Sequence, residues 1–157
     1  METIMSGLEG GCACGEVRYR LTTSPMFVHC CHCLNCQRQT GTAFVLNILI
    51  EASRVEQQGG PPTPIEVPRE NGLHRIFRCP KCQVAVWSEY GGRSAVLFVR
   101  AGTLDDPASV SPDVHIYTRS KLPWITLPAS VPAFEEYYDT AALWPPESLA
   151  RRKAALG

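Results

Sequence analysis

The chain has 157 residues, 45% of them hydrophobic and 19% charged, a composition that fits one folded domain and excludes a disordered chain. Its fifteen basic residues balance its fifteen acidic ones, and this lack of a basic excess argues against a nucleic-acid partner. No apolar run approaches the ~20 residues that cross a bilayer, and the first five residues, Met1-Glu2-Thr3-Ile4-Met5, lack the features of a secretory signal, so we expect a cytoplasmic protein with no membrane partner.

The first half of the chain predicts short strands separated by turns. Residues 16–21 alternate, with Val17, Tyr19 and Leu21 on one face and charged residues on the other, as in a half-buried strand. Residues 26–29 predict a second short strand, and the apolar, β-branched residues 42–50 predict a third. The Gly- and Pro-rich residues 59–72 predict a loop with one short edge strand at 65–67.

The second half predicts further strands at residues 73–77, 84–90, 95–100 and 114–118. Gly91-Gly92 is typical of a hairpin turn, and Asp105-Asp106-Pro107 of a turn. Trp124 is expected in the core. Pro145-Pro146-Glu147 predicts the start of a short C-terminal helix. We therefore expect a mainly β domain over residues 1–139 and a helical tail over residues 140–157.

Eight cysteines stand in three tight clusters, and none lies beyond Cys82. In a chain without a secretory signal, such close pairs indicate metal or thiol chemistry rather than disulfides. Four thiolates suit the tetrahedral coordination of Zn²⁺. We predict one structural zinc that pins the first strand to the middle hairpin, held by Cys12, Cys14, Cys79 and Cys82. The alternatives are ordinary buried thiols or a redox CxxC pair, although such a pair usually opens a helix and residues 83–87 are strand-like.

The densest cluster is His-Cys-Cys-His-Cys-Leu-Asn-Cys, residues 29–36. The spacing of Cys31, Cys33 and Cys36 lets one compact loop place three sulfurs around a metal. Three protein ligands and one open position are typical of a catalytic zinc rather than a structural one. Successive residues of an extended segment point in opposite directions, which sets Cys30 and His32 apart from these three cysteines.

Two other interpretations of this cluster stay open. A closed four-ligand site would take its fourth ligand from His29, His32 or Cys30. A vicinal pair of Cys30 and Cys31 would instead support thiol redox chemistry.

The motifs together resemble the glutathione-dependent formaldehyde-activating enzyme family, which also includes the centromere protein V type. The matching segments of the first half are Gly-Gly-Cys-x-Cys-Gly-x-Val-x-Tyr (10–19), Cys-His-Cys-x-x-Cys-x-x-x-x-Gly (31–41) and Phe-x-Cys-x-x-Cys (77–82). Residues 102–107, 115–124 and 132–134 extend the match, so that the resemblance covers residues 7–139. One departure is Gln83, where the family usually has glycine, and we expect a changed turn there.

The resemblance implies a zinc-pinned β-tent fold of short antiparallel sheets with two zinc ions. The first is structural, and the second is catalytic and is held by Cys31, Cys33 and Cys36. A small thiol such as glutathione would bind the second ion as its fourth ligand. The implied reaction makes or breaks a carbon–sulfur bond, as between glutathione and formaldehyde in S-hydroxymethylglutathione, which is carbon–sulfur lyase chemistry.

Within this frame Lys121 is expected to attract a carboxylate of the thiol, and Arg38 to orient it, although both also fit solvated side chains. His115 is expected to be a hydrogen-bonded structural residue. The rival functions are a non-catalytic zinc module that binds a protein partner, as the centromere branch suggests, and a redox enzyme that uses Cys30 and Cys31.

Overall fold

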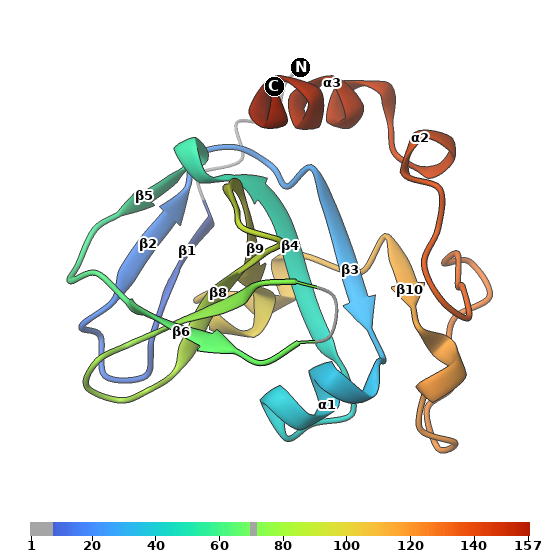
Figure 1. Ribbon diagram of the computed structural model, residues 1–157, viewed down its shortest axis with the longest axis horizontal. Coiled ribbons are helices and arrows are strands. Elements are labelled where there is room, and N and C mark those ends of the chain that lie inside the picture. Colours follow the sequence, from blue (N-terminus) through green and yellow to red (C-terminus); the bar gives the residue numbers. More distant parts are fainter. Residues whose placement is uncertain (1–7, 70–71) are drawn as a thin grey trace.

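The computed structural model describes residues 8–69 and 72–157, so the Met1–Met5 segment considered above for a secretory signal lies outside the described residues. The fold is mainly β, as expected, and contains two sheets (Figure 1). A three-stranded sheet has the order β1-β2-β5, and a seven-stranded sheet has the order β10-β3-β4-β9-β8-β7-β6. The neighbouring strands are antiparallel except for β10, which runs parallel to β3.

The small sheet consists of β1 (Leu8–Gly11), β2 (Arg18–Leu21) and β5 (Val55–Gln57). The large sheet consists of β3 (Phe27–Cys31), β4 (Val45–Glu51), β6 (Thr63–Val67), β7 (His74–Arg78), β8 (Ala85–Tyr90), β9 (Arg93–Arg100) and β10 (Val114–Ile116). The helices are α1 (Leu34–Thr40), α2 (Thr140–Leu143) and α3 (Pro146–Leu156). Four single 3₁₀ turns complete the described elements, namely η1 (Ala52–Arg54), η2 (Ala101–Thr103), η3 (Pro107–Ser109) and η4 (Thr118–Ser120).

Most of the strands predicted from the sequence are confirmed to within a few residues. The short strand predicted at 65–67 lies at the edge of the large sheet as β6. Gly91 and Gly92 form the predicted hairpin turn with φ of 64° and 70°, the left-handed values that a two-residue hairpin turn requires and glycine adopts without strain. The sequence did not reveal β1, β5 or the helix α1.

The large sheet is buried on both faces at β3 and β4, which are apolar at successive positions, whereas its edge strand β6 is mostly exposed. Val28 and Ile48 point toward the small sheet and join the fully buried Tyr19 and Leu21 of β2, which confirms the predicted alternation of that strand. Phe27, one residue before Val28, belongs to a second core cluster on the opposite face. Trp124 was expected in the core, but its side chain is 73% exposed because residues 121–131 form an irregular surface loop.

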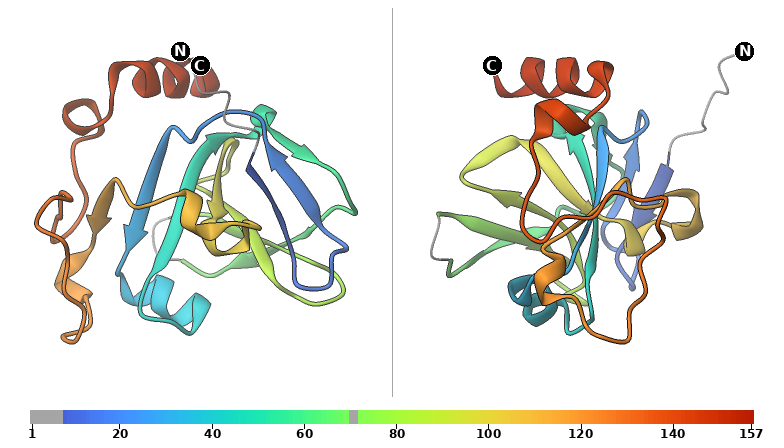
Figure 2. Two further views of the ribbon diagram at one scale, coloured as in Figure 1. Left: turned by 180° about the vertical axis from the view of Figure 1, so that it is seen from behind. Right: turned by 90° about the vertical axis from the view of Figure 1, so that its right-hand side faces the viewer.

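The C-terminal segment packs against the second core cluster, and Figures 1 and 2 show α3 lying across one end of the large sheet. Trp144 stacks on Phe27 with ring centroids 5.2 Å apart, and its indole N–H donates to the Tyr138 hydroxyl at 2.7 Å. The sequence placed a domain boundary at residue 139, and that division stays a prediction, although α2 and α3 pack directly on the sheet. Among the described residues, no helix is long and apolar enough to cross a membrane.

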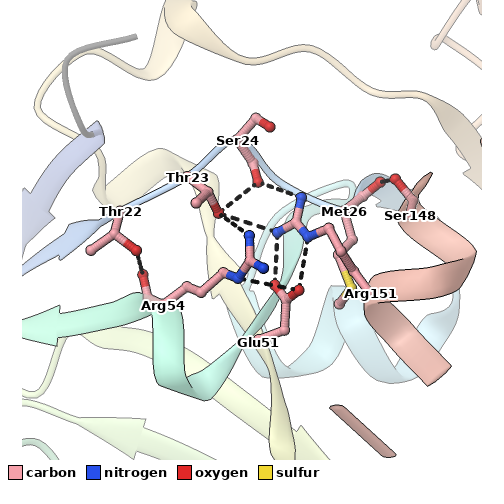
Figure 3. Close-up of polar contacts among 8 residues, drawn as sticks. All are labelled: Thr22, Thr23, Ser24, Met26, Glu51, Arg54, Ser148 and Arg151. Atoms are coloured by element: carbon pink, nitrogen blue, oxygen red, sulfur yellow. Dashed lines mark hydrogen bonds and ion pairs between the residues drawn. The ribbon is translucent and has the colours of Figure 1, made fainter. Parts of the chain in front are cut away.

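A buried ion pair attaches α3 to the end of β4 (Figure 3). Arg151 binds both carboxylate oxygens of Glu51, at 2.8 and 2.7 Å, and also donates to the Ser24 carbonyl at 3.0 Å. Ser148 donates to the Met26 carbonyl at 2.7 Å. Burial alone would raise the pKa of Glu51, but its hydrogen bonds, chiefly to Arg151, bring that pKa below the usual value.

We expect Arg151→Ala to lower the free energy of unfolding by about 2 kcal/mol, because it removes both short hydrogen bonds to a buried carboxylate and leaves only the longer, 3.4 Å ion pair with Arg54. Glu51→Gln should cost less, because Arg151 can turn toward solvent. The folded pKa of Glu51 is depressed, so the pair's contribution is present at neutral pH and is lost as the pH falls through the carboxyl range. Urea unfolding at pH 7 and pH 4 measures both effects. If Arg151→Ala lowered the free energy of unfolding equally at the two pH values, the pH dependence assigned to the pair would be wrong.

Candidate functional site

The first cysteine cluster joins the β1–β2 turn to the β7–β8 turn, on the side of the small sheet. The Sγ atoms of Cys12 and Cys14 lie 3.6 Å apart, and those of Cys14 and Cys79 lie 3.7 Å apart. With Cys82, all four ligand atoms lie within 4.8 Å of one another. Thiolates around a tetrahedral Zn²⁺ are roughly 3.8 Å apart, so the residues fit the predicted closed metal site.

The β7–β8 turn keeps an unusual backbone at Gln83. We expected a changed turn because glycine is absent, but Gln83 itself has a left-handed φ of 66°. Its N–H donates to the Cys79 carbonyl at 3.0 Å, closing the turn that presents the two sulfurs. A non-glycine residue in this region costs on the order of 1–3 kcal/mol, whereas zinc binding contributes on the order of 10 kcal/mol. A bound ion would therefore outweigh the strain.

The second cluster lies where β3 passes into α1. Cys31 is the last residue of β3, Cys33 caps the N-terminus of α1, and Cys36 is buried in its first turn. The Cys33 sulfur accepts the Cys36 backbone N–H at 3.3 Å, in place of the oxygen that usually caps a helix. The three ligand atoms lie within 4.8 Å of one another. The compact loop expected from the spacing is thus a strand-to-helix junction.

Ionisation of one of these three thiols disfavours ionisation of the other two. Hydrogen bonds from Cys31 and Cys36, with backbone N–H groups of Cys36 and Asn35, lower the pKa of Cys33. The same contact with Cys33 raises the pKa of Cys31 to about 12, and contacts with both neighbours and burial raise that of Cys36. A metal ion would reverse this by keeping all three sulfurs as thiolates. The donor set and its spacing therefore fit a three-sulfur metal site.

Cys30 and His32 belong to a different group, as the alternation predicted. The Cys30 sulfur lies 3.6 Å from His32 Nε2, which is hydrogen-bonded to His115 Nδ1 at 3.0 Å. The three residues are buried, and their ligand atoms also lie within metal-binding distance of one another. The hydrogen bond accounts for the expected structural role of His115. Burial raises the pKa of Cys30 to about 12, which makes this thiol a poor nucleophile.

A cavity of about 640 Å³ opens beside the three cysteines. Its floor includes His29 of β3 and Asn47 of β4, and Tyr90 of β8 forms one side. Burial lowers the pKa of His29 to about 4, so this side chain is neutral at pH 7, and its Nε2 is hydrogen-bonded to the Tyr138 hydroxyl. Two cationic side chains, Arg69 and Arg119, also line the cavity.

A layer of polar side chains lies between the large sheet and α1. Arg100 of β9 donates to Asn47 Oδ1 at 2.6 Å and to Ser88 Oγ at 3.1 Å. Gln39 of α1 accepts from Arg100 at 3.4 Å and is hydrogen-bonded to His74 at 3.2 Å. Sequence reasoning did not find this layer, because its members are single polar residues on four strands and a helix.

The two substrate-binding residues expected from the sequence lie away from this cavity. Lys121 donates to the backbone carbonyls of Ile125 at 2.6 Å and Leu122 at 3.3 Å. Arg38 is exposed on α1. Neither residue lines the cavity beside the three cysteines, and their roles toward substrate stay predictions.

Comparison with known proteins gives consistent results. The model of the family described as glutathione-dependent formaldehyde-activating enzyme matches residues 7–120. A protein of Halomonas elongata, provisionally named as a glutathione-dependent formaldehyde-activating enzyme, is 27% identical over 157 aligned residues, covering 96% of each chain. The crystal structure of a Rhodobacter sphaeroides protein matches with a TM-score of 0.51 and 15% identity, over 81% of this chain and 100% of that one. At that identity the likeness concerns the fold alone.

We expect the protein purified without chelator to contain about two zinc ions per chain. Cys36→Ser should reduce the count to about one and leave a folded protein, because only the open site is lost. Cys79→Ser should unfold the protein or strongly destabilise it, because metal binding at a closed site is coupled to folding. Elemental analysis with circular dichroism measures both. A count of two in the Cys36→Ser variant would contradict the assignment of the second site.

Proposed function

We propose, from the premise that this chain belongs to the glutathione-dependent formaldehyde-activating enzyme family, that it is a zinc-dependent carbon–sulfur lyase. Its substrate would be the adduct of a small thiol with an aldehyde, such as S-hydroxymethylglutathione. The observation that carries the proposal is the position of Cys31, Cys33 and Cys36 beside a cavity of about 640 Å³. A metal held there would have room for a further ligand on its open side.

The second cysteine cluster supplies the ligands for this chemistry. Cys31, Cys33 and Cys36 would hold the ion, which when bound would keep an incoming thiol deprotonated at neutral pH. The residues fit this role because their ligand atoms lie within 4.8 Å of one another.

The reaction needs no oxidant or reductant. In the direction of synthesis, the thiolate sulfur attacks the carbonyl carbon of formaldehyde and a C–S bond forms. The π electrons of the carbonyl move to its oxygen, which then takes a proton. In the reverse direction the hydroxyl loses that proton and the C–S bond breaks.

The chain offers two donors to the oxygen on which charge develops. Asn47 lines the cavity, and because its Oδ1 accepts from Arg100, its amide nitrogen is left to donate. Tyr90 also lines the cavity, and burial raises the pKa of its hydroxyl to about 12, so it keeps its proton at neutral pH. Hydrogen-bond donors aimed at a developing oxyanion favour the transition state over the ground state.

Two arginines make the cavity suitable for a thiol that carries carboxylates. Arg69 lies over the Tyr90 ring at 5.1 Å from its centroid, which holds the guanidinium beside the cavity. Arg119 pairs with Glu136 at 2.6 Å at an exposed position, where ion pairs are weak and exchange readily. Glutathione has two carboxylates, and either guanidinium can bind one of them in bidentate fashion.

We expect the zinc-loaded protein to accelerate the exchange between formaldehyde with glutathione and S-hydroxymethylglutathione, measured by NMR exchange spectroscopy. Cys33→Ser and Cys36→Ser should reduce the rate to that of the spontaneous reaction. Cys30→Ala is the matched control, because Cys30 lies in the separate histidine group, and it should keep most of the activity. Loss of activity in Cys30→Ala, with activity kept in Cys33→Ser and Cys36→Ser, would contradict the assignment of the reaction to the three-cysteine site. A fully zinc-loaded protein without any rate effect would favour the non-catalytic module.

Substitution of the cavity arginines should act on binding of charged thiols. We expect Arg69→Gln and Arg119→Gln each to raise KM for glutathione on the order of tenfold, since a charge-assisted pair is lost, with little change for the uncharged 2-mercaptoethanol. Arg38→Gln and Lys121→Gln test the residues expected from the sequence. A larger rise in KM for these two than for the cavity variants would place the carboxylate site outside the cavity.

A further inference from the structure

Arg100 is a buried cation with only neutral hydrogen-bond partners. Its side chain is 7% exposed, and it donates to Asn47, Ser88 and Gln39. Its Nε atom is buried and has no partner. Within residues 8–69 and 72–157, no carboxylate forms an ion pair with it.

Such an arrangement is costly, because a buried charge is normally compensated by an opposite one. Elsewhere the chain follows this rule. The buried carboxylates Glu51 and Glu89 are paired with Arg151 and Arg75 respectively. The charge of Arg100 therefore requires a nearby anion, and none of the side chains to which it donates carries a negative charge.

The sheet register places Arg100 on the same face of the large sheet as His29 and Cys31, two strands away from β3. Arg100 is opposite Asn47 on β4, and Asn47 is opposite His29 on β3. Both Asn47 and His29 line the cavity beside the cysteines. From the other side, Arg100 contacts Gln39, which is one helical turn beyond Cys36 on α1.

The Tyr90 hydroxyl offers a second indication of proximity. Tyr90 lines the same cavity as Cys36, and burial is the main cause of its raised pKa, which Arg100 lowers. Tyr90 thus borders the three-cysteine cavity and lies within electrostatic range of the guanidinium.

We infer that Arg100 is a positioning residue that supplies the counter-charge of the metal-loaded three-cysteine site; this rests on the proposed function. A divalent ion with three thiolates has a formal charge of minus one, and one guanidinium balances it. Through Asn47 and Gln39 the same side chain also fixes the floor of the cavity and the helix that carries Cys36.

The test compares three variants by their zinc affinity at the three-cysteine site, measured by competition with a chromophoric chelator. Cys36→Ser identifies which of the two release steps belongs to that site. We expect Arg100→Gln to weaken binding at least on the order of tenfold, the usual effect of losing a partner just outside the ligands. Arg100→Lys keeps the positive charge and should weaken zinc binding several-fold less than Arg100→Gln does. The four-cysteine site should bind as in the wild type and reports that each variant is folded.

Asn47→Asp separates charge from structure. It is isosteric and keeps an acceptor for Arg100, but it neutralises the guanidinium with a nearby carboxylate. We expect it to weaken zinc binding about as much as Arg100→Gln, whereas a purely structural role predicts unchanged or tighter binding. This variant also decides the question should Arg100→Gln fail to fold.

Two results would overturn the inference while the proposed function stands. One is wild-type affinity in Asn47→Asp, and the other is an equal loss in Arg100→Lys and Arg100→Gln. A wild-type protein that binds no metal at Cys31, Cys33 and Cys36 would instead remove the proposed function, and this inference with it.

Discussion

The alternation of side chains along β3 is the constraint on which the rest of the structure depends. At β3 the large sheet is buried on both faces, so each residue of this strand is assigned to one face or the other. Val28 and Cys30 point away from the face of Phe27, His29 and Cys31. A shift of the register by one residue would exchange Cys30 for Cys31 and place the wrong thiol beside Cys33 and Cys36. The pairing of Cys31 with Val45 and of His29 with Asn47 therefore fixes the chemistry of the site together with its packing.

The C-terminal segment contributes to the same face. Trp144 donates to the Tyr138 hydroxyl, which is hydrogen-bonded to His29 in the cavity floor. Tyr138 thus helps to bury His29 and keep it neutral, while Trp144 of the tail holds the Tyr138 hydroxyl and covers Phe27. The sequence pattern of residues 140–157 does not indicate this role, because the role depends on contacts among Trp144, Tyr138 and His29 that form only in the folded chain. The sequence-based division at residue 139 follows composition, whereas the packing crosses that position.

Local patterns explain what could be predicted. Period-two alternation marked β2, glycine pairs marked the β8–β9 hairpin, and the same alternation separated Cys30 from the three-cysteine set. The helix α1 was missed because it has seven residues and a cysteine rather than an oxygen-bearing side chain at its cap. Gln39 and Arg100 were missed because their contacts join an isolated helix to a distant strand. Lys121 looked like a free cation, since only the folded loop shows the carbonyls it binds.

The two cysteine clusters differ in how their charge would be balanced, and this difference suits their proposed roles. The four-cysteine cluster is closed and lies partly at the surface, with Lys81 and Glu16 nearby, where water screens its charge. The three-cysteine cluster lies against a buried layer in which Arg100 would offset a metal with three thiolates. A fourth thiolate, that of the substrate, would then be the uncompensated charge in the cavity. Addition to an aldehyde moves this charge from sulfur to oxygen, beside Asn47 and Tyr90, and protonation removes it. In the proposed reaction, a site that is neutral before substrate binds would therefore favour the step that consumes the thiolate, and Arg69 and Arg119 would attract the thiol from outside.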